Sequence, residues 1–151
     1  MKIILALLTL LVSVNAVFCQ KLEKNKENGL YESSTVIKFE DNKLIENLKS
    51  RLITLNYKIT FTSDSLISAS RTYSLGDLTG QDVTYTVNVT ARPNRYRFVF
   101  TNFLVNVSSG QSTLEHLGFG ITGLWVRNIN KKLPQLISDL DLNNTKKKDD
   151  W

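Results

Sequence analysis

The sequence predicts an α+β fold, with an antiparallel sheet of about five strands and two helices packed on one face of it. Apolar and polar residues alternate through several short segments between residues 34 and 107, as they do in strands with one buried face. Two further segments repeat their apolar residues every three or four positions, as amphipathic helices do. The predicted order of strand, helix, four strands and helix suits a two-layer sandwich whose second sheet face is uncovered.

The first 19 residues are predicted to be a signal peptide. Lys2 precedes the apolar segment 3–12, which is too short to span a bilayer comfortably. Small residues allow cleavage after Ala16 or after Cys19, and we favour the second site, which leaves Gln20 first. The alternatives for this segment are an N-terminal membrane anchor or a buried strand, and lipid attachment to Cys19. We therefore expect export to the periplasm or cell envelope, or secretion, with no membrane span in the mature chain.

The charge of the chain argues against a nucleic-acid partner. The formal net charge is +5 at pH 7, and part of the excess lies in Lys146–Lys148, directly followed by Asp149 and Asp150. A nucleic-acid-binding protein normally gathers lysine and arginine on one face, with aromatic residues between them. We expect these charges to be solvated instead, and residues 143–151 to form a charged tail.

The predicted domain covers residues 34–142. Residues 20–33 before it are polar and lack any periodicity, which predicts a flexible N-terminal arm. The domain is expected to begin with a half-buried strand over residues 34–40, where apolar and polar side chains alternate.

A helix is predicted after this strand. Asp41 or Asn42 is expected to cap it, because short polar side chains accept hydrogen bonds from the free amides of a first turn. Asn56 is expected to end it, because asparagine tolerates the left-handed conformation. Four leucines at spacings of four, four and three form the apolar face of this helix: Leu44, Leu48, Leu52 and Leu55.

Two predicted strands follow the helix. In the strand at residues 57–62, Phe61 is expected on the same side as Ile59. The strand at residues 67–75 alternates apolar residues with serine and threonine. A loop is expected at Gly76–Gly80, where glycine and aspartate favour turns.

The next two strands form the hairpin with the clearest pattern in the chain. Residues 83–90 alternate without exception, and residues 95–107 alternate with one slip. The apolar side chains change parity between Phe100 and Phe103, which would turn the core residues to solvent in a regular strand. We therefore expect a bulge or a bend near residues 101–102.

The second helix is predicted from an apolar stripe over residues 124–140, after a loop at Gly118–Gly123. Trp125 lies in this stripe and is expected in the core. Pro134 lacks the amide hydrogen that a helix interior needs, so we expect a kink or a new helical segment there.

The sequence lacks the residues that most enzyme sites require. His116 is the only histidine, which excludes a site with several histidine ligands. The chain also lacks a glycine-rich phosphate loop and the common hydrolase motifs. Asp64, Asp77 and Asp82 lie in predicted turns, where aspartate is favoured by backbone geometry. We therefore predict no enzymatic activity, no cofactor and no metal.

The hairpin carries a resemblance to a known group of proteins. Its second strand begins with Arg95-Tyr96-Arg97-Phe98, after Asn94 in the turn. This resembles exported bacterial domains of unknown function with a TATA-binding-protein-like fold, which often have glycine at the turn position. The resemblance extends over residues 34–142 and implies the order β-α-β4-α. It carries over no catalytic residue, and the fold is no warrant for DNA binding.

The uncovered sheet face is the candidate site. It is expected to present six polar residues: Thr84, Thr86, Asn88, Thr90, Arg95 and Arg97. Two arginines among hydroxyl groups suit a carboxylate- or phosphate-bearing partner. We expect a non-enzymatic binding or accessory module of the cell envelope, whose partner is an unidentified envelope protein or small ligand. The alternative is a carrier of a small apolar ligand between sheet and helices, in a cavity lined by Tyr85, Tyr96, Phe98 and Phe100.

Overall fold

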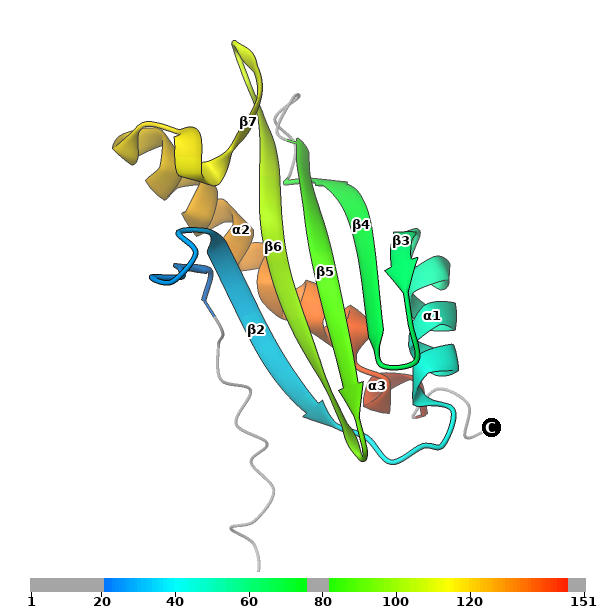
Figure 1. Cartoon of the computed structure of the whole chain (residues 1–151). Coiled ribbons are helices and arrows are strands. Elements are labelled where there is room, and N and C mark those ends of the chain that lie inside the picture. The colour runs from blue at the N-terminus through cyan, green and yellow to red at the C-terminus, as the bar shows by residue number, and fades with distance from the viewer. Residues whose placement is uncertain (1–20, 76–81, 147–151) are drawn as a thin grey trace, which may run out of the picture.

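The structure is a computed structural model that describes residues 21–75 and 82–146 of the 151-residue chain. One antiparallel sheet faces the viewer in Figure 1, and α1 and α2 lie behind it. The elements are β1 (Glu23–Lys24), β2 (Tyr31–Lys38), α1 (Leu44–Thr54), β3 (Lys58–Thr62), β4 (Leu66–Ser74), β5 (Asp82–Arg92), β6 (Arg95–Val107), β7 (Gly110–Thr113), the 3-10 helix η1 (Leu114–His116), α2 (Phe119–Leu140) and α3 (Asn143–Lys146). The predicted α+β class is confirmed.

Three predictions concern residues that the structure does not describe. The signal peptide with Cys19, the loop at Gly76–Gly80 and residues 147–151 of the tail lie outside the described residues.

The sheet has seven strands within the described residues, rather than about five. Their order is β1-β2-β6-β5-β4-β3, and β7 also pairs with β6. The long strand β6 has β5 along one side; β2 pairs with its first half on the other side, and β7 pairs with its second half. The strands missed by the prediction are β1 and β7, which are too short to show a period in the sequence.

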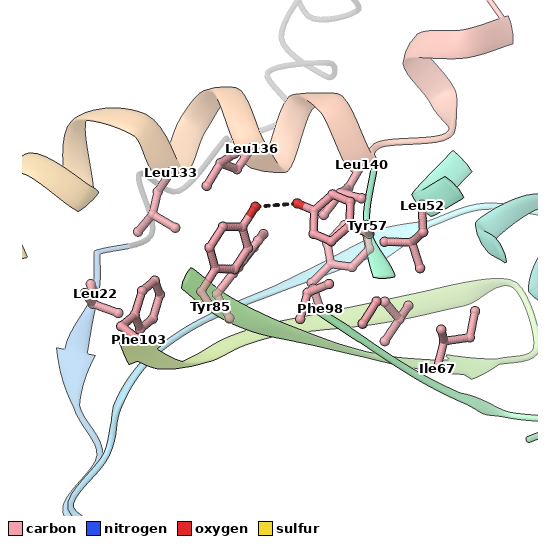
Figure 2. Close-up of a cluster of buried hydrophobic side chains, with 14 of the residues drawn as sticks. Leu22, Leu52, Tyr57, Ile67, Tyr85, Phe98, Phe103, Leu133, Leu136 and Leu140 are labelled. Atoms are coloured by element: carbon pink, nitrogen blue, oxygen red, sulfur yellow. Dashed lines mark hydrogen bonds between the residues drawn. The ribbon is translucent and has the colours of Figure 1, made fainter. Parts of the chain in front are cut away.

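The core lies between the sheet and the two helices. Figure 2 shows Tyr85 and Phe98 on the sheet opposite Leu133, Leu136 and Leu140 of α2. None of these five side chains is more than 6% exposed. Within the core, the hydroxyl groups of Tyr57 and Tyr85 are 2.6 Å apart and share a hydrogen bond. The predicted burial of Leu48, Leu52 and Trp125 is confirmed.

The predicted bulge in β6 is confirmed. Thr86 pairs with Thr101 and Thr84 with Leu104, so Tyr85 lies opposite two residues, Asn102 and Phe103. Asn102 takes up the extra residue with φ of 53°, a conformation that asparagine tolerates better than most residues. The bulge keeps Phe103 fully buried after the change of parity.

A second bulge, in β3, contradicts the prediction for Phe61. Ile59 pairs with Ala69 and Phe61 with Ser68, so Thr60 is the extra residue. The bulge turns Phe61 to the open face of the sheet, where it is exposed, whereas Ile59 packs against the core. The sequence alternates regularly here, and only the pairing with β4 shows the shift.

Residues 21–33 differ from the flexible arm that the sequence predicts. They contain β1 and the beginning of β2, and Leu22 is buried in the core. The amide of Leu22 donates to the Asn130 side chain of α2 at 2.7 Å. Tyr31 also packs against the core, and its amide donates to Glu115. Isolated contacts of this kind leave no periodic signal in the sequence.

The first helix begins differently from the prediction. Lys43 occupies the N-cap position of α1 and makes no side-chain cap. Asp41 instead accepts from the amide of Lys43 at 2.8 Å and from the side chain of Asn47 at 2.9 Å. Asn56 has φ of 61° directly after the helix, as predicted.

The C-terminal helices correct the expected start of the second helix and part of the expected tail, and they exclude a new helical segment at Pro134. α2 begins at Phe119, inside the predicted loop at Gly118–Gly123, and continues through Pro134 without a new segment. Buried leucines on both sides of the proline, at positions 133 and 136, hold the helix against the sheet. The beginning of the predicted tail forms the short helix α3.

Candidate functional site

The candidate site lies on the sheet face that α1 and α2 leave uncovered. β5 alternates between fully buried residues on the helix side and partly exposed residues on the open face. The six predicted site residues all lie on the open face, but pairing divides them into two groups. Thr90 and the two arginines lie near the hairpin turn, whereas Thr84 lies six residues further along β5, roughly 20 Å away.

The part of the open face away from the hairpin turn carries Ser68, Thr72, Thr84 and Asn88, and we call it the hydroxyl end. Cross-strand contacts occupy these side chains. The hydroxyl of Thr84 is 2.7 Å from that of Thr72 on β4, and Ser68 donates to Asn88 at 2.8 Å. In both cases the two residues are direct cross-strand neighbours. Such pairs stabilise a sheet. This end therefore serves the stability of the sheet.

The basic end of the open face gathers four cations on three strands. Arg95 pairs with Arg92 on β5 and with Lys38 on β2. Arg97 pairs with Thr90 and with Val36, which flanks the cluster and is 58% exposed. We call this group the basic cluster: Lys38, Arg92, Arg95 and Arg97.

All four cations of the basic cluster are exposed. Their side chains form no hydrogen bond or ion pair with any residue that the structure describes. Directly opposite residues in a sheet have Cβ atoms about 5 Å apart, and like charges at that spacing repel. No described carboxylate is therefore paired with the cluster, although Asp41 and Asp64 line the same hollow as Arg92, and an external anion can supply a partner.

Two members of the basic cluster were not among the predicted site residues. Arg92 could have been found, because it shares the parity of Thr90 and Asn88 along one strand. Lys38 could not, because its place depends on the pairing of β2 with β6, which are separated by more than fifty residues in the sequence.

The helix-side face holds a group of tyrosines that does not reach this site. Burial raises the pKa of Tyr57, Tyr73 and Tyr85 above the usual value. For Tyr57 this rise in pKa is opposed by the hydrogen bond to Tyr85 and by the positive charge of Arg71. The guanidinium carbon of Arg71 is 5.4 Å from the centroid of the Tyr57 ring. These hydroxyl groups remain protonated at neutral pH and serve packing.

Two surface hollows lie near the ends of the elements. The larger, about 760 Å³, is formed by the residues before α1, the β3–β4 turn and the β5–β6 turn, and most of its lining residues are exposed. The smaller, about 320 Å³, lies between α1 and Leu142. Neither is lined by the buried aromatic residues that the apolar-carrier alternative requires: Tyr85, Tyr96, Phe98 and Phe100.

The described residues also bear on metals and membranes. No group of three or more histidine, cysteine, aspartate or glutamate side chains within residues 21–75 and 82–146 is placed to hold a metal ion. His116 is exposed, with its Nδ1 atom 3.2 Å from the hydroxyl of Thr113. No helix in these ranges has the length and apolarity needed to cross a bilayer.

Comparisons with known proteins establish the fold. No protein-family model and no curated protein matches the sequence. A TBP-like protein from Parabacteroides distasonis superimposes with a TM-score of 0.57 at 12% identity, covering 78% of this chain and 94% of its own. A DUF4468 family protein from Bacteroides ovatus superimposes with a TM-score of 0.58 at 11% identity, covering 82% of this chain and 89% of its own. The fold is TATA-binding-protein-like. The resemblance in fold expected from the hairpin is thereby confirmed, and at these identities the similarity concerns the fold alone.

Proposed function

We propose that this protein is an exported, non-enzymatic binding or accessory module of the cell envelope, which binds an anionic partner through the basic cluster. The observation that carries the proposal is the convergence of Lys38, Arg92, Arg95 and Arg97 on an uncovered sheet face. The partner is a protein or ligand that bears carboxylate or phosphate groups, because arginine recognises both through paired hydrogen bonds.

The geometry of the face supports binding more than a purely solvated surface. The cations lie on three adjacent strands of a rigid sheet, so their spacing is fixed by backbone hydrogen bonds rather than by a loop. Val36 adds an apolar contact beside Arg97. An interface that combines arginine with exposed apolar surface is typical of protein-binding sites.

The carrier of an apolar ligand is the weaker candidate. Its site would lie between sheet and helices, where the aromatic side chains of β5 and β6 are at most 1% exposed and pack against one another. The two hollows described above lie at the surface instead. Non-enzymatic action and export remain proposals, supported by the residue content and by the apolar leader.

The test is a binding measurement with the variant Arg95→Ser/Arg97→Ser. Immobilised polyglutamate serves as a defined anionic probe, beside an extract of the native envelope from which the bound partner is identified. We expect roughly tenfold or greater loss of binding to both, since two charged contacts are removed. The thermal midpoint is expected to stay nearly unchanged, because both side chains are exposed.

The matched control removes two charges elsewhere. Lys26→Ser/Lys58→Ser deletes two exposed lysines outside the basic cluster and should leave binding unchanged. Equal losses in both double variants would show non-specific attraction and contradict the proposal. Undiminished binding by the arginine variant would place the site elsewhere, and tight arginine-dependent binding to duplex DNA would contradict the expected class of partner.

A further inference from the structure

The first turns of α2 expose three large apolar side chains to solvent. Phe119 is 99% exposed, Ile121 is 53% exposed and Leu124 is 45% exposed. We call these residues the apolar tip. The glycines at positions 118, 120 and 123 leave open space around it, since no atom beyond the neighbouring residues and the local helix backbone lies within 4 Å of the place where a Cβ would be. An exposed phenylalanine flanked by glycines contributes nothing to the core.

Cations follow Leu124, the last residue of the apolar tip, on its own face of the helix. Arg127 and Lys131 come three and seven residues after Leu124 and are exposed, with Lys132 beside them. The distance along the axis from Leu124 to Lys131 is about 10 Å, at 1.5 Å per residue. Asp139, near the other end, is the only acidic residue in α2. The exposed face of the helix therefore passes from apolar to basic along its length.

The 3-10 helix and the first turn of α2 contain little free negative charge. Glu115, in the preceding 3-10 helix, has its carboxylate 2.8 Å from the amide of Tyr31, which donates to it. The first turn of α2 has no acidic residue, and Gly118 provides no side-chain cap. The partial positive charge of the helix N-terminus is thus uncompensated at the tip and favours anions.

The tip also projects from the body of the molecule. In Figure 1 the first turns of α2, in yellow-orange, extend past the edge of the sheet beside the start of β2. The β5–β6 turn, which carries the basic cluster, is at the opposite end of the sheet. The apolar tip and the basic cluster share no residue, so each can be occupied while the other is free.

We propose that the apolar tip docks on an anionic lipid surface. Helices that bind at a bilayer interface place apolar side chains about 5–10 Å into the boundary between headgroups and acyl chains, with basic residues toward the headgroups. Phe119, Ile121 and Leu124 supply the apolar part, and Arg127, Lys131 and Lys132 lie at the distance that reaches the phosphate layer. Docking of this kind requires no membrane-spanning helix and leaves the basic cluster directed away from the lipid.

The test is co-sedimentation with vesicles. The whole chain is expressed and purified after processing, and its mass is measured, because an uncleaved apolar leader would itself bind lipid. We expect binding to phosphatidylglycerol vesicles that weakens with salt, and much weaker binding to phosphatidylcholine vesicles. Phe119→Ser/Leu124→Ser should lower the partition coefficient about tenfold or more, since two large apolar side chains no longer enter the interface. Ile53→Ser is the matched control, because Ile53 is 62% exposed on α1, away from the tip, and should leave partitioning unchanged.

A second variant reports insertion directly. Phe119→Trp keeps an apolar side chain at the tip, and its fluorescence should shift to shorter wavelength with phosphatidylglycerol vesicles and be quenched by brominated lipids. Equal partitioning of Phe119→Ser/Leu124→Ser and the parent chain would overturn the proposal. The proposal would also be overturned if the parent chain did not bind vesicles and was a dimer, whereas Phe119→Ser/Leu124→Ser was a monomer. The tip would then join copies of the chain. Arg95→Ser/Arg97→Ser should change vesicle binding by no more than about twofold, which separates this proposal from that for the basic cluster.

Discussion

The two faces of β5 carry different residues and serve different purposes. On the helix side Val83, Tyr85, Val87 and Val89 have no exposed surface, whereas the alternating threonine and asparagine residues are partly exposed on the other side. Successive side chains of a strand point to opposite faces, so one segment can hold the core and present a surface at the same time. Substitutions on the open face can therefore be used to probe binding without unfolding the protein.

The largest expected difference between the faces is at β6. Phe98 is fully buried, and its neighbour Arg97 is exposed on the opposite face. Phe98→Ala should cost about 3–5 kcal/mol in the free energy of unfolding. Arg97→Ala should stay within about 0.5 kcal/mol. Urea unfolding measures the free energy of unfolding of both variants. Comparable decreases in the two would mean that Arg97 supports the fold.

The same contrast is expected across α1. Leu52→Ala should lower the free energy of unfolding by about 2–5 kcal/mol, because the leucine is fully buried between α1 and the sheet. Lys49→Ala, on the other side of this helix, should change it by no more than about 0.5 kcal/mol. Urea titrations of the two variants provide the comparison. If the two variants lost the same free energy of unfolding, the packed face of α1 would be misassigned.

A smaller effect is expected from the buried tyrosine pair. Tyr85→Phe removes the hydrogen bond to Tyr57 and should cost about 1–2 kcal/mol at neutral pH. Burial raises the pKa of Tyr85 in the folded state, whereas the unfolded chain ionises near the usual value of about 10. The unfolded state therefore releases protons first, and the stability supplied by this group is lost as pH rises above about 10. Unfolding between pH 8 and about 11 should show a steeper alkaline loss in the parent than in Tyr85→Phe. If the stability of the parent and of Tyr85→Phe fell in parallel with rising pH, Tyr85 would not be the group responsible for the alkaline loss.

The smallest effects should come from the hydroxyl end of the open face. Thr84→Ala and Asn88→Ala each remove one cross-strand contact and should cost about 0.2–1 kcal/mol. Neither should weaken capture of the anionic partner, since Thr84 lies roughly 20 Å from Thr90 along β5, and the side-chain oxygen of Asn88 already accepts from Ser68. Thermal unfolding and polyglutamate binding test this pair of expectations, and loss of binding in Thr84→Ala would extend the site along the whole strand.

The sequence predicted the parts of the fold that leave a local pattern. The apolar face of α1, the alternation in β5, and the bulge at Asn102 were predicted because each depends on residue types at fixed short spacings. Phe61 was placed on the wrong face because the bulge at Thr60 is visible only in the pairing of β3 with β4. The docking of Leu22 was missed for a similar reason, since its partner Asn130 is 108 residues away.

The candidate site was predicted in part for the same physical reason. Arg95 and Arg97 follow directly from the parity of β6. Lys38 joins them only because β2 pairs with β6, a long-range contact that no local pattern encodes. The predicted site residues Thr84 and Thr86 share the face with the arginines but lie too far along β5 to join them in one small site. Asn88 is only two residues from Thr90, but its side-chain oxygen accepts from Ser68.

The central claim is that an anion binds at the basic cluster of the open face. It is tested most directly by an NMR titration of the isotope-labelled protein with a short polyglutamate peptide. We expect amide shift changes concentrated on Val36, Lys38, Thr90, Arg92 and residues 94–97, since Pro93 has no amide proton, and suppression of these changes in Arg95→Ser/Arg97→Ser. Changes centred instead on Thr84 and Thr86, on Lys43, Glu46 and Lys49 at the α1 side of the larger hollow, or spread evenly over all exposed lysines would contradict binding at the basic cluster.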